Sequence, residues 1–145
     1  MQVRPVDAGD REGWGRLYAG YAAFYGAEQD EAMRDRVWDW LTDPAHEVSG
    51  WVAEQDGALV GLAHARPFAR PLAASVGGFL DDLFVAPEAR GAGVAAALIE
   101  RVADEGRRRG WSVVRWITAR DNAAARALYD RMAAETAWVT YDIRL

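Results

Sequence analysis

One short stretch of the sequence brings together residue types that bind phosphate. It reads Val85-Ala-Pro-Glu-Ala-Arg90-Gly91-Ala92-Gly93-Val94-Ala95, in which an apolar run ends, a glycine-rich turn follows and a helical pattern begins. The first turn of a helix has unpaired N–H groups and a partial positive charge, so it attracts anions. Gly91 and Gly93 lack the Cβ atoms that would hold an anion away from the backbone. We predict an anion site here; an ordinary strand-to-helix turn is the alternative.

Two adjacent carboxylates, Asp81 and Asp82, stand in the apolar run just before this turn. A carboxylate can accept a proton from an amine, through water or after its environment has shifted its pKa. Successive residues of a strand point to opposite faces, so we expect only one of the two to reach a given cleft. A structural role, in which an Asp caps a turn or pairs with an Arg, is the alternative.

The composition excludes several kinds of site. The chain has no Cys, so it has no disulfide, thiolate nucleophile or Cys-ligated zinc. It has 17 Arg and no Lys, which excludes a Schiff-base lysine and a Walker-type phosphate loop. With only two histidines, His46 and His64, we expect no metal site. His64 falls within an expected strand and is interpreted as a structural residue.

The formal net charge of −5 disfavours nucleic acid as a partner and suits a small cationic substrate. No run approaches the roughly 20 apolar residues that a membrane span needs. The first residues also lack the apolar run of a signal peptide. We therefore expect a cytoplasmic protein with one domain over residues 1–145 and no membrane partner.

The elements that must position these residues follow from periodicity and from helix- and strand-breaking residues. Residues 2–6 read as a strand that ends at Asp7, a residue type that favours helix caps. Two helices follow, one through Trp14 to Tyr25 and one over 31–41. Asp56-Gly57 predicts a tight hairpin between strands 50–55 and 58–65. Residues 66–77 are predicted as a loop.

The second half alternates strands and helices. We expect strands over 78–86 and 112–118, helices over 91–109 and 122–133, and a last strand over about 137–144. Antiparallel pairing suits the first half, and a crossover onto the same sheet suits the second. The fold class is therefore α/β, with a single mixed, mostly antiparallel sheet and helices on both faces.

Two motifs in this order resemble those of GCN5-related N-acetyltransferases, the GNAT superfamily. Arg90-x-x-Gly93-x-Ala95 matches the family's Arg/Gln-x-x-Gly-x-Gly/Ala signature. Asn122-x-x-Ala125-x-x-Leu128-Tyr129 matches its second cofactor element. The resemblance covers residues 78–145 well, and the earlier residues match mainly in element order.

Residues 79–85 also look like the acidic strand of diamine and polyamine acetyltransferases, and residues 111–129 like the small microbial histone/polyamine branch. One departure stands out. Where the family usually has Gly-Phe after the tyrosine, this chain has Ala133-Ala134, which leaves the end of the last helix open.

The resemblance implies an acetyl-CoA-dependent N-acetyltransferase that acts on a primary amine of a small cationic substrate, by direct attack in a ternary complex. It implies that the backbone from Arg90 to Ala95 cradles the pyrophosphate and that the pantetheine arm pairs with Leu83–Val85, which splays the sheet. The implied cofactor contacts are Leu83, Phe84, Val85, Arg90, Gly91, Ala92, Gly93, Val94, Ala95, Asn122, Ala125 and Tyr129.

The resemblance also assigns roles. Tyr129 matches the tyrosine that protonates the departing thiolate, with a core residue as the alternative, and Asn122 is equally expected to cap its helix. We assign Asp81 to deprotonation of the amine and Asp82 to the substrate's charge, although the two roles could be reversed. Tyr25 is expected to line the amine site by cation–π contact.

A homodimer is expected by the same resemblance. Two further functions stay open. One is a protein or peptide acetyltransferase that modifies lysines or N-termini. The other is a non-catalytic sensor that binds acyl-CoA.

Overall fold

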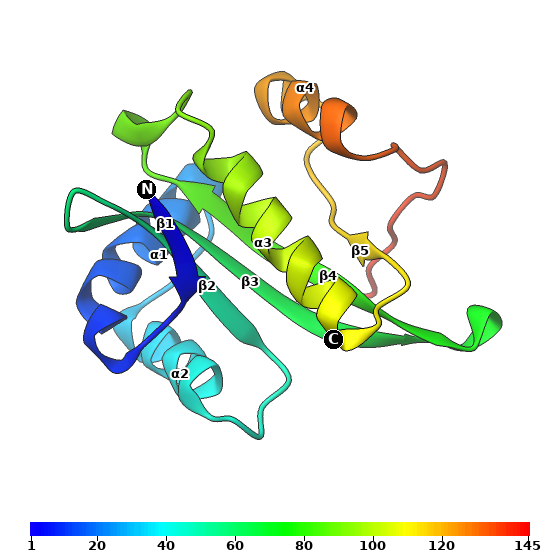
Figure 1. Ribbon diagram of the computed structural model, residues 1–145, viewed down its shortest axis with the longest axis horizontal. Coiled ribbons are helices and arrows are strands. Elements are labelled where there is room, and N and C mark those ends of the chain that lie inside the picture. Colours follow the sequence, from blue (N-terminus) through cyan, green and yellow to red (C-terminus); the bar gives the residue numbers. More distant parts are fainter.

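The computed structural model describes all 145 residues, and one five-stranded sheet lies at its centre (Figure 1). The strands are β1 (Gln2–Pro5), β2 (Ser49–Gln55), β3 (Ala58–Arg70), β4 (Ser75–Val85) and β5 (Val114–Arg115). They lie in the order β1-β2-β3-β4-β5, and only β4 and β5 are parallel. The expected α/β fold with a mixed, mostly antiparallel sheet is confirmed.

Helices cover both faces of this sheet (Figure 1). They are α1 (Arg11–Tyr25), α2 (Glu31–Thr42), α3 (Val94–Arg109) and α4 (Ala123–Met132), and short 3-10 turns lie at Ala8–Asp10, Pro71–Ala73 and Pro87–Ala89. α1 and α2 pack on one face and α3 packs on the other. None of the helices has the length and apolar character that a membrane span requires.

Each face of the sheet has its own core, because neighbouring strand residues point to opposite faces. Trp51 packs on the side of α3, whereas Val52 packs on the side of α1. The core under α1 contains Trp14, Leu17, Val52, Leu62, Phe84 and Ala86. The core under α3 contains Trp51, Ala53, Ala63, Ala65, Leu80, Val85, Val94, Leu98, Ile99 and Val102.

β4 and β5 pair over only two residues each. Gly78 lies opposite Val114, and Phe79 lies opposite Arg115. Beyond this point the strands separate, so the β4 backbone from Leu80 to Val85 has no strand beside it on the β5 side. The expected splay of the sheet is confirmed, but the strand expected over 112–118 is much shorter than that range.

The segment 66–77, expected to be a loop, is mostly a long hairpin. β3 continues to Arg70 and β4 begins at Ser75. Pro67 disfavours a strand in this segment, since proline cannot donate a hydrogen bond to a neighbouring strand. The pairing of β3 with β2 stops at Ala65, however, which lies opposite Ser49, the first residue of β2. Beyond Ala65, β3 therefore has one free edge. A proline is tolerated in a strand with a free edge.

The strand expected over 137–144 is absent. α4 ends at Met132, and residues 133–145 form neither helix nor strand. Because β5 has only two residues, it offers no long edge with which a further strand could pair. The large apolar side chains of this tail are exposed: Trp138, Val139, Tyr141, Ile143 and Leu145.

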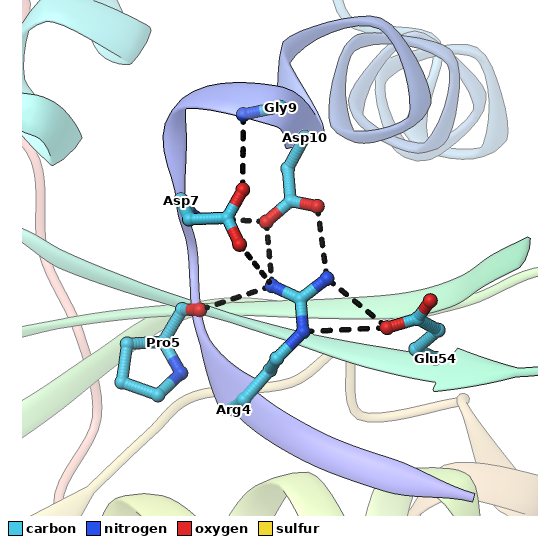
Figure 2. A network of polar contacts seen from close by, with 6 residues as sticks. All are labelled: Arg4, Pro5, Asp7, Gly9, Asp10 and Glu54. Atoms are coloured by element: carbon cyan, nitrogen blue, oxygen red, sulfur yellow. Dashed lines mark hydrogen bonds and ion pairs between the residues drawn. The ribbon is translucent and has the colours of Figure 1, made fainter. Parts of the chain in front are cut away.

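An ion-pair network ties β1 to β2 and to the turn before α1 (Figure 2). Arg4 donates to both carboxylate oxygens of Asp10, at 2.7 and 3.0 Å, and to Glu54 at 3.1 Å. Asp10 also accepts from the Asp7 amide at 2.8 Å, and Asp7 caps the turn by accepting from the Gly9 amide. The hydrogen bond from Arg4 lowers the pKa of Asp10 although burial opposes this. The network fixes the chain where it enters α1.

Candidate active site

A cavity of about 490 Å³ lies beside the unpaired part of β4, between the first turn of α3 and α4. We call it the β4–α4 cavity. Every residue expected to contact the cofactor lines it except Ala92, and so does Tyr25. Those lining residues are Leu83, Phe84, Val85, Arg90, Gly91, Gly93, Val94, Ala95, Asn122, Ala125 and Tyr129. The fold thus brings the two motifs to one place.

The turn that precedes α3 needs glycine for its backbone. Gly91 and Gly93 have φ angles of 84° and 81°, a region that L side chains rarely adopt. No heavy atom lies within 4 Å of the place where a Cβ would stand on either residue, so the turn is open. Gly93 is the N-cap of α3, and no side chain caps this end of the helix. The geometry fits a phosphate group, which would bind the unpaired amides of the first turn.

The side chains of Arg90 and Asn122 stabilise the walls of this cavity by hydrogen bonds to the backbone. Nε of Arg90 donates to the carbonyl of Val85 at 3.2 Å, and its guanidinium lies over the rings of Phe24 and Phe84, at 5.3 and 5.7 Å. Oδ1 of Asn122 accepts from the Ala125 amide at 3.4 Å, so Asn122 caps α4. This cap uses only the side-chain oxygen of Asn122 and leaves the amide nitrogen for a ligand.

Tyr129 lies half-buried in the same cavity. Its ring packs edge-on against Trp116, with centroids 5.4 Å apart and an interplanar angle of 74°. Burial raises the pKa of the Tyr129 phenol, so it stays protonated at neutral pH. A protonated phenol within hydrogen-bond reach can donate its proton to a leaving thiolate.

A second cavity, of about 390 Å³, holds the acidic pair. We call it the acidic cavity, and it is lined by Tyr18, Val37, Trp40, His46, Glu47, Val48, His64, Arg66, Asp81 and Asp82. The two cavities are neighbours. Asp82 and Leu83 are consecutive residues that line different cavities, and the rings of Tyr18 and Tyr21, which do the same, stack at 6.1 Å.

Both Asp81 and Asp82 line this cavity, so the expectation that only one could reach it is wrong. The register of β3 and β4 shifts here: His64 lies opposite Asp82, and Ala65 lies opposite Leu80. Asp81 is therefore the extra residue of a β-bulge. A bulge interrupts the alternation of side chains along a strand and re-aims one of them.

A chain of buried hydrogen bonds fixes the protonation of His64. Its Nε2 lies 2.9 Å from Nε1 of Trp14, and its Nδ1 lies 2.8 Å from Oδ2 of Asp82. An indole N–H can only donate, so Nε2 must accept. The imidazole proton therefore stands on Nδ1 and is donated to Asp82. This tautomer makes His64 a neutral, structural residue, as interpreted from the sequence.

Asp82 and Asp81 differ in their readiness to take up a proton. Burial opposes ionisation of Asp82, but hydrogen bonds from His64 and from the Tyr18 hydroxyl, at 2.9 Å, outweigh burial and lower its pKa. The Asp81 side chain is 31% exposed, and its Oδ2 lies 3.1 Å from Nε of Arg66. Burial raises the pKa of Asp81, and Arg66 only partly opposes the rise. Of the two, Asp82 is thus the more readily ionised, and Asp81 is the better proton acceptor.

Sequence reasoning missed three residues of this cavity network: Trp14, Tyr18 and Arg66. The available signal was the spacing of His64 and Arg66, which places both on one face of a strand. Tyr25 was expected to line the amine site, but it lines the β4–α4 cavity and not the acidic cavity. The structure contains no group of three or more His, Cys, Asp or Glu side chains that could hold a metal ion.

Residues 14–134 match the sequence profile of the acetyltransferase (GNAT) family. The chain belongs to this family. The GNAT chain is 27% identical over 141 residues to the D-amino-acid N-acetyltransferase HPA3 of Saccharomyces cerevisiae, covering 96% of this chain and 88% of the yeast protein. It is thus an acetyl-CoA-dependent N-acetyltransferase.

Solved structures agree with this assignment of the GNAT chain. A ribosomal-protein-alanine N-acetyltransferase from Brucella melitensis biovar Abortus 2308 is 28% identical, with a TM-score of 0.81 and 100% of both chains covered. A probable acetyltransferase at 23% identity shares the fold, with a TM-score of 0.88 over 100% of this chain and 98% of its own. The matches place the chain in the GNAT superfamily as a whole and single out no polyamine or histone-type branch.

Proposed function

We propose that this enzyme acetylates the primary amine of a small cationic molecule, with acetyl-CoA in the β4–α4 cavity and the amine in the acidic cavity. The observation that carries the proposal is the boundary between the two cavities on the α1 side of β4, where Asp82 lines the acidic cavity and Phe84, on the same face, lines the β4–α4 cavity. An amine held at the carboxylates would lie next to the strand edge that receives the acyl carrier. The net charge of −5 supports a cationic acceptor in the cytoplasm rather than nucleic acid.

In this proposal the chain's own groups bind and orient the cofactor. Bound acetyl-CoA supplies the activated acetyl group. The amides that follow Gly93 hold its phosphates, and the unpaired backbone of Leu83–Val85 pairs with the pantetheine arm. Free amides on this edge also polarise the acyl carbonyl. The nitrogen of Asn122, which its helix cap does not use, contacts the same arm in this proposal.

Proton transfers accompany the acyl transfer. Asp81 accepts a proton from the ammonium, directly or through water, because ammonium has no lone pair with which to attack. The amine nitrogen then forms its bond to the acyl carbon while the carbon–sulfur bond breaks. Tyr129 donates a proton to the departing thiolate and regains one, directly or through solvent, when the acylated nitrogen loses its second proton. Asp82 holds the substrate's positive charge. The attack is direct because this chain has no Cys or Lys to carry the acetyl group.

The test is the rate of CoA release from acetyl-CoA across a panel of amines. D-amino acids enter the panel because the yeast relative carries that activity in its name, and polyamines and aminoglycosides represent other small cations. We expect a strong dependence on the added amine and its loss in Asp81→Asn. A flat rate across the panel, with acetyl-CoA still bound, would leave the acyl-CoA sensor as the function.

A protein or peptide acceptor is the second candidate. It is favoured by the 28% identity to the Brucella ribosomal-protein-alanine enzyme. Peptides with free N-termini or internal lysines therefore belong in the same panel. If they react at least tenfold faster than every small amine, this second function replaces the first.

We also propose that the enzyme is a homodimer of a single catalytic domain over residues 1–145. The exposed tail supports this, since its large apolar side chains would leave water at an interface between two chains. Trp138 and Ile143, for example, are 84% and 88% exposed. Sedimentation should give about twice the 16.0 kDa of one chain, and a monomer across the accessible concentrations would reject the dimer.

A further inference from the structure

The acidic cavity contains one guanidinium, that of Arg66, and this group is held on two sides. Nε donates to Asp81, and the guanidinium carbon lies 5.1 Å from the ring centroid of Phe79. Asp81 is the only residue that accepts a hydrogen bond from Arg66, and it accepts from Nε alone. Both terminal nitrogens therefore remain available. A fixed guanidinium with two free nitrogens is the geometry that binds a carboxylate in bidentate fashion.

Positive and negative charges thus stand side by side in this cavity. Nε of Arg66 lies 3.1 Å from Oδ2 of Asp81, and the neighbouring Asp82 adds a second carboxylate to the same cavity. A molecule that carries an ammonium and a carboxylate on the same carbon matches this pairing. A diamine or an aminoglycoside would instead present a second positive charge toward Arg66.

The cavity also has a flat, largely apolar wall. The rings of Trp40 and His46 stack with centroids 5.1 Å apart and an interplanar angle of 3°. Val37 and Val48 complete this side. A planar or apolar side chain can pack against such a wall, and a volume of about 390 Å³ falls within the usual size of small-molecule sites.

We propose, on the basis of the function proposed above, that the acceptor is an α-amino acid with an aromatic or other apolar side chain. Arg66 binds its α-carboxylate, Asp81 and Asp82 receive its α-ammonium, and its side chain packs along Trp40 and His46. Arg66 is thereby the residue that distinguishes amino acids from simple amines.

The test compares an amino acid with its amide, which keeps the amine but lacks the carboxylate charge. For the wild type and for Arg66→Gln, kcat/KM is measured with D- and L-phenylalanine and with the corresponding phenylalaninamides. The ratio of acid to amide is taken for each enzyme, and then the two ratios are compared. The intrinsic reactivity of each amine cancels in this comparison, and so does any change in Asp81 that the substitution causes. Arg70→Gln, on the same strand but outside the cavity, is the matched control.

We expect the acid-to-amide ratio to fall at least tenfold in Arg66→Gln for the preferred enantiomer, to stay within twofold in Arg70→Gln and to recover in part in Arg66→Lys, which keeps the charge but not the fork. A ratio unchanged by Arg66→Gln while amines are still acetylated overturns the carboxylate site and leaves the proposed function intact.

Calorimetric titration of the wild-type protein with the same compounds gives an independent readout. The acids should bind at least tenfold more tightly than the amides. This measurement decides the matter if Arg66→Gln does not fold, or if no amine is turned over and the proposed function itself fails. Equal binding of acid and amide contradicts the inference.

Discussion

Trp14 and His64 are 50 residues apart in sequence, and their side chains meet at 2.9 Å in the interior, where they are 0% and 1% exposed. Because the indole nitrogen can only donate, this one bond decides which imidazole nitrogen carries the proton. The proton on Nδ1 then faces Asp82. A helix residue far from the acidic pair thus helps to keep one carboxylate ionised.

The first prediction concerns this bond. Trp14→Phe leaves Nε2 of His64 buried without a donor, which should lower the free energy of unfolding by about 1–3 kcal/mol beyond the effect of the lost ring volume. The matched control is Trp38→Phe. Trp38 packs against Trp14 with ring centroids 5.1 Å apart, and its only hydrogen bond to another side chain is through its backbone carbonyl.

Chemical denaturation of the two variants measures the difference. Nitrogen NMR of the wild type should also show His64 with a protonated Nδ1 and an unprotonated Nε2 at neutral pH. Equal losses in the two variants, or a doubly protonated His64, would contradict the assigned tautomer.

Local sequence was sufficient for the β4–α4 cavity but not for the acidic cavity. Arg90, Gly93 and Asn122 each stand at the start or end of an element, where short-range rules fix backbone geometry and the motif spacing fixes separation. The acidic cavity depends on strand register instead. The pairing register of β3 and β4 shifts by one residue between His64 and Ala65, which puts Asp81 on the same side as Asp82. The spacing of residues in the sequence does not predict such a bulge.

The second prediction concerns Tyr129. Tyr129→Phe should lower kcat about a hundredfold, the usual contribution of a positioned proton donor, and leave the KM for acetyl-CoA within about twofold. The raised pKa of this phenol means that its proton is available throughout the neutral range. Steady-state kinetics with a saturating amine provides the measurement.

Tyr141→Phe is the control for this change, because Tyr141 is 89% exposed in the tail and lines neither cavity. A rise in the KM for acetyl-CoA without a fall in kcat would reassign Tyr129 to packing of the cavity wall.

The third prediction tests the phosphate site at the start of α3. Gly93→Glu should weaken acetyl-CoA binding at least tenfold, because a carboxylate would stand where the phosphates bind. Gly110→Glu is a close control: Gly110 caps the other end of the same helix, has a φ of 76° and likewise has open space around it. The two substitutions carry similar backbone strain and the same charge. Calorimetric titration with CoA compares them, and similar affinities would show that the phosphates bind elsewhere.

The tail shows a further limit of local patterns. Residues 137–144 alternate in the manner of a strand, yet a strand also needs a neighbour to pair with. β5 is too short to provide one, and the chain leaves α4 at Ala133 in an extended conformation. Pairing partners are a property of the whole sheet, so this outcome could not be read from the segment alone.

The last prediction concerns acid stability and the network around Arg4. Asp10 is ionised in the folded protein with a pKa below the ordinary value of an aspartate, because Arg4 donates to both of its oxygens. The stabilisation that this adds is fully present above about pH 4, the pKa of an unfolded aspartate, and is lost as the pH falls through the lower folded value. Asp10→Asn should therefore lower the free energy of unfolding by about 3 kcal/mol at pH 7, and less stability should then be lost below pH 4.

The control is Asp7→Asn, which changes an exposed carboxylate that lies 3.4 Å from the same guanidinium. It should change the free energy of unfolding by less than about 1 kcal/mol. Denaturation curves between pH 2 and 7 distinguish the two variants. If they lose the same stability at pH 7, the Arg4–Asp10 pair does not hold β1 against the start of α1.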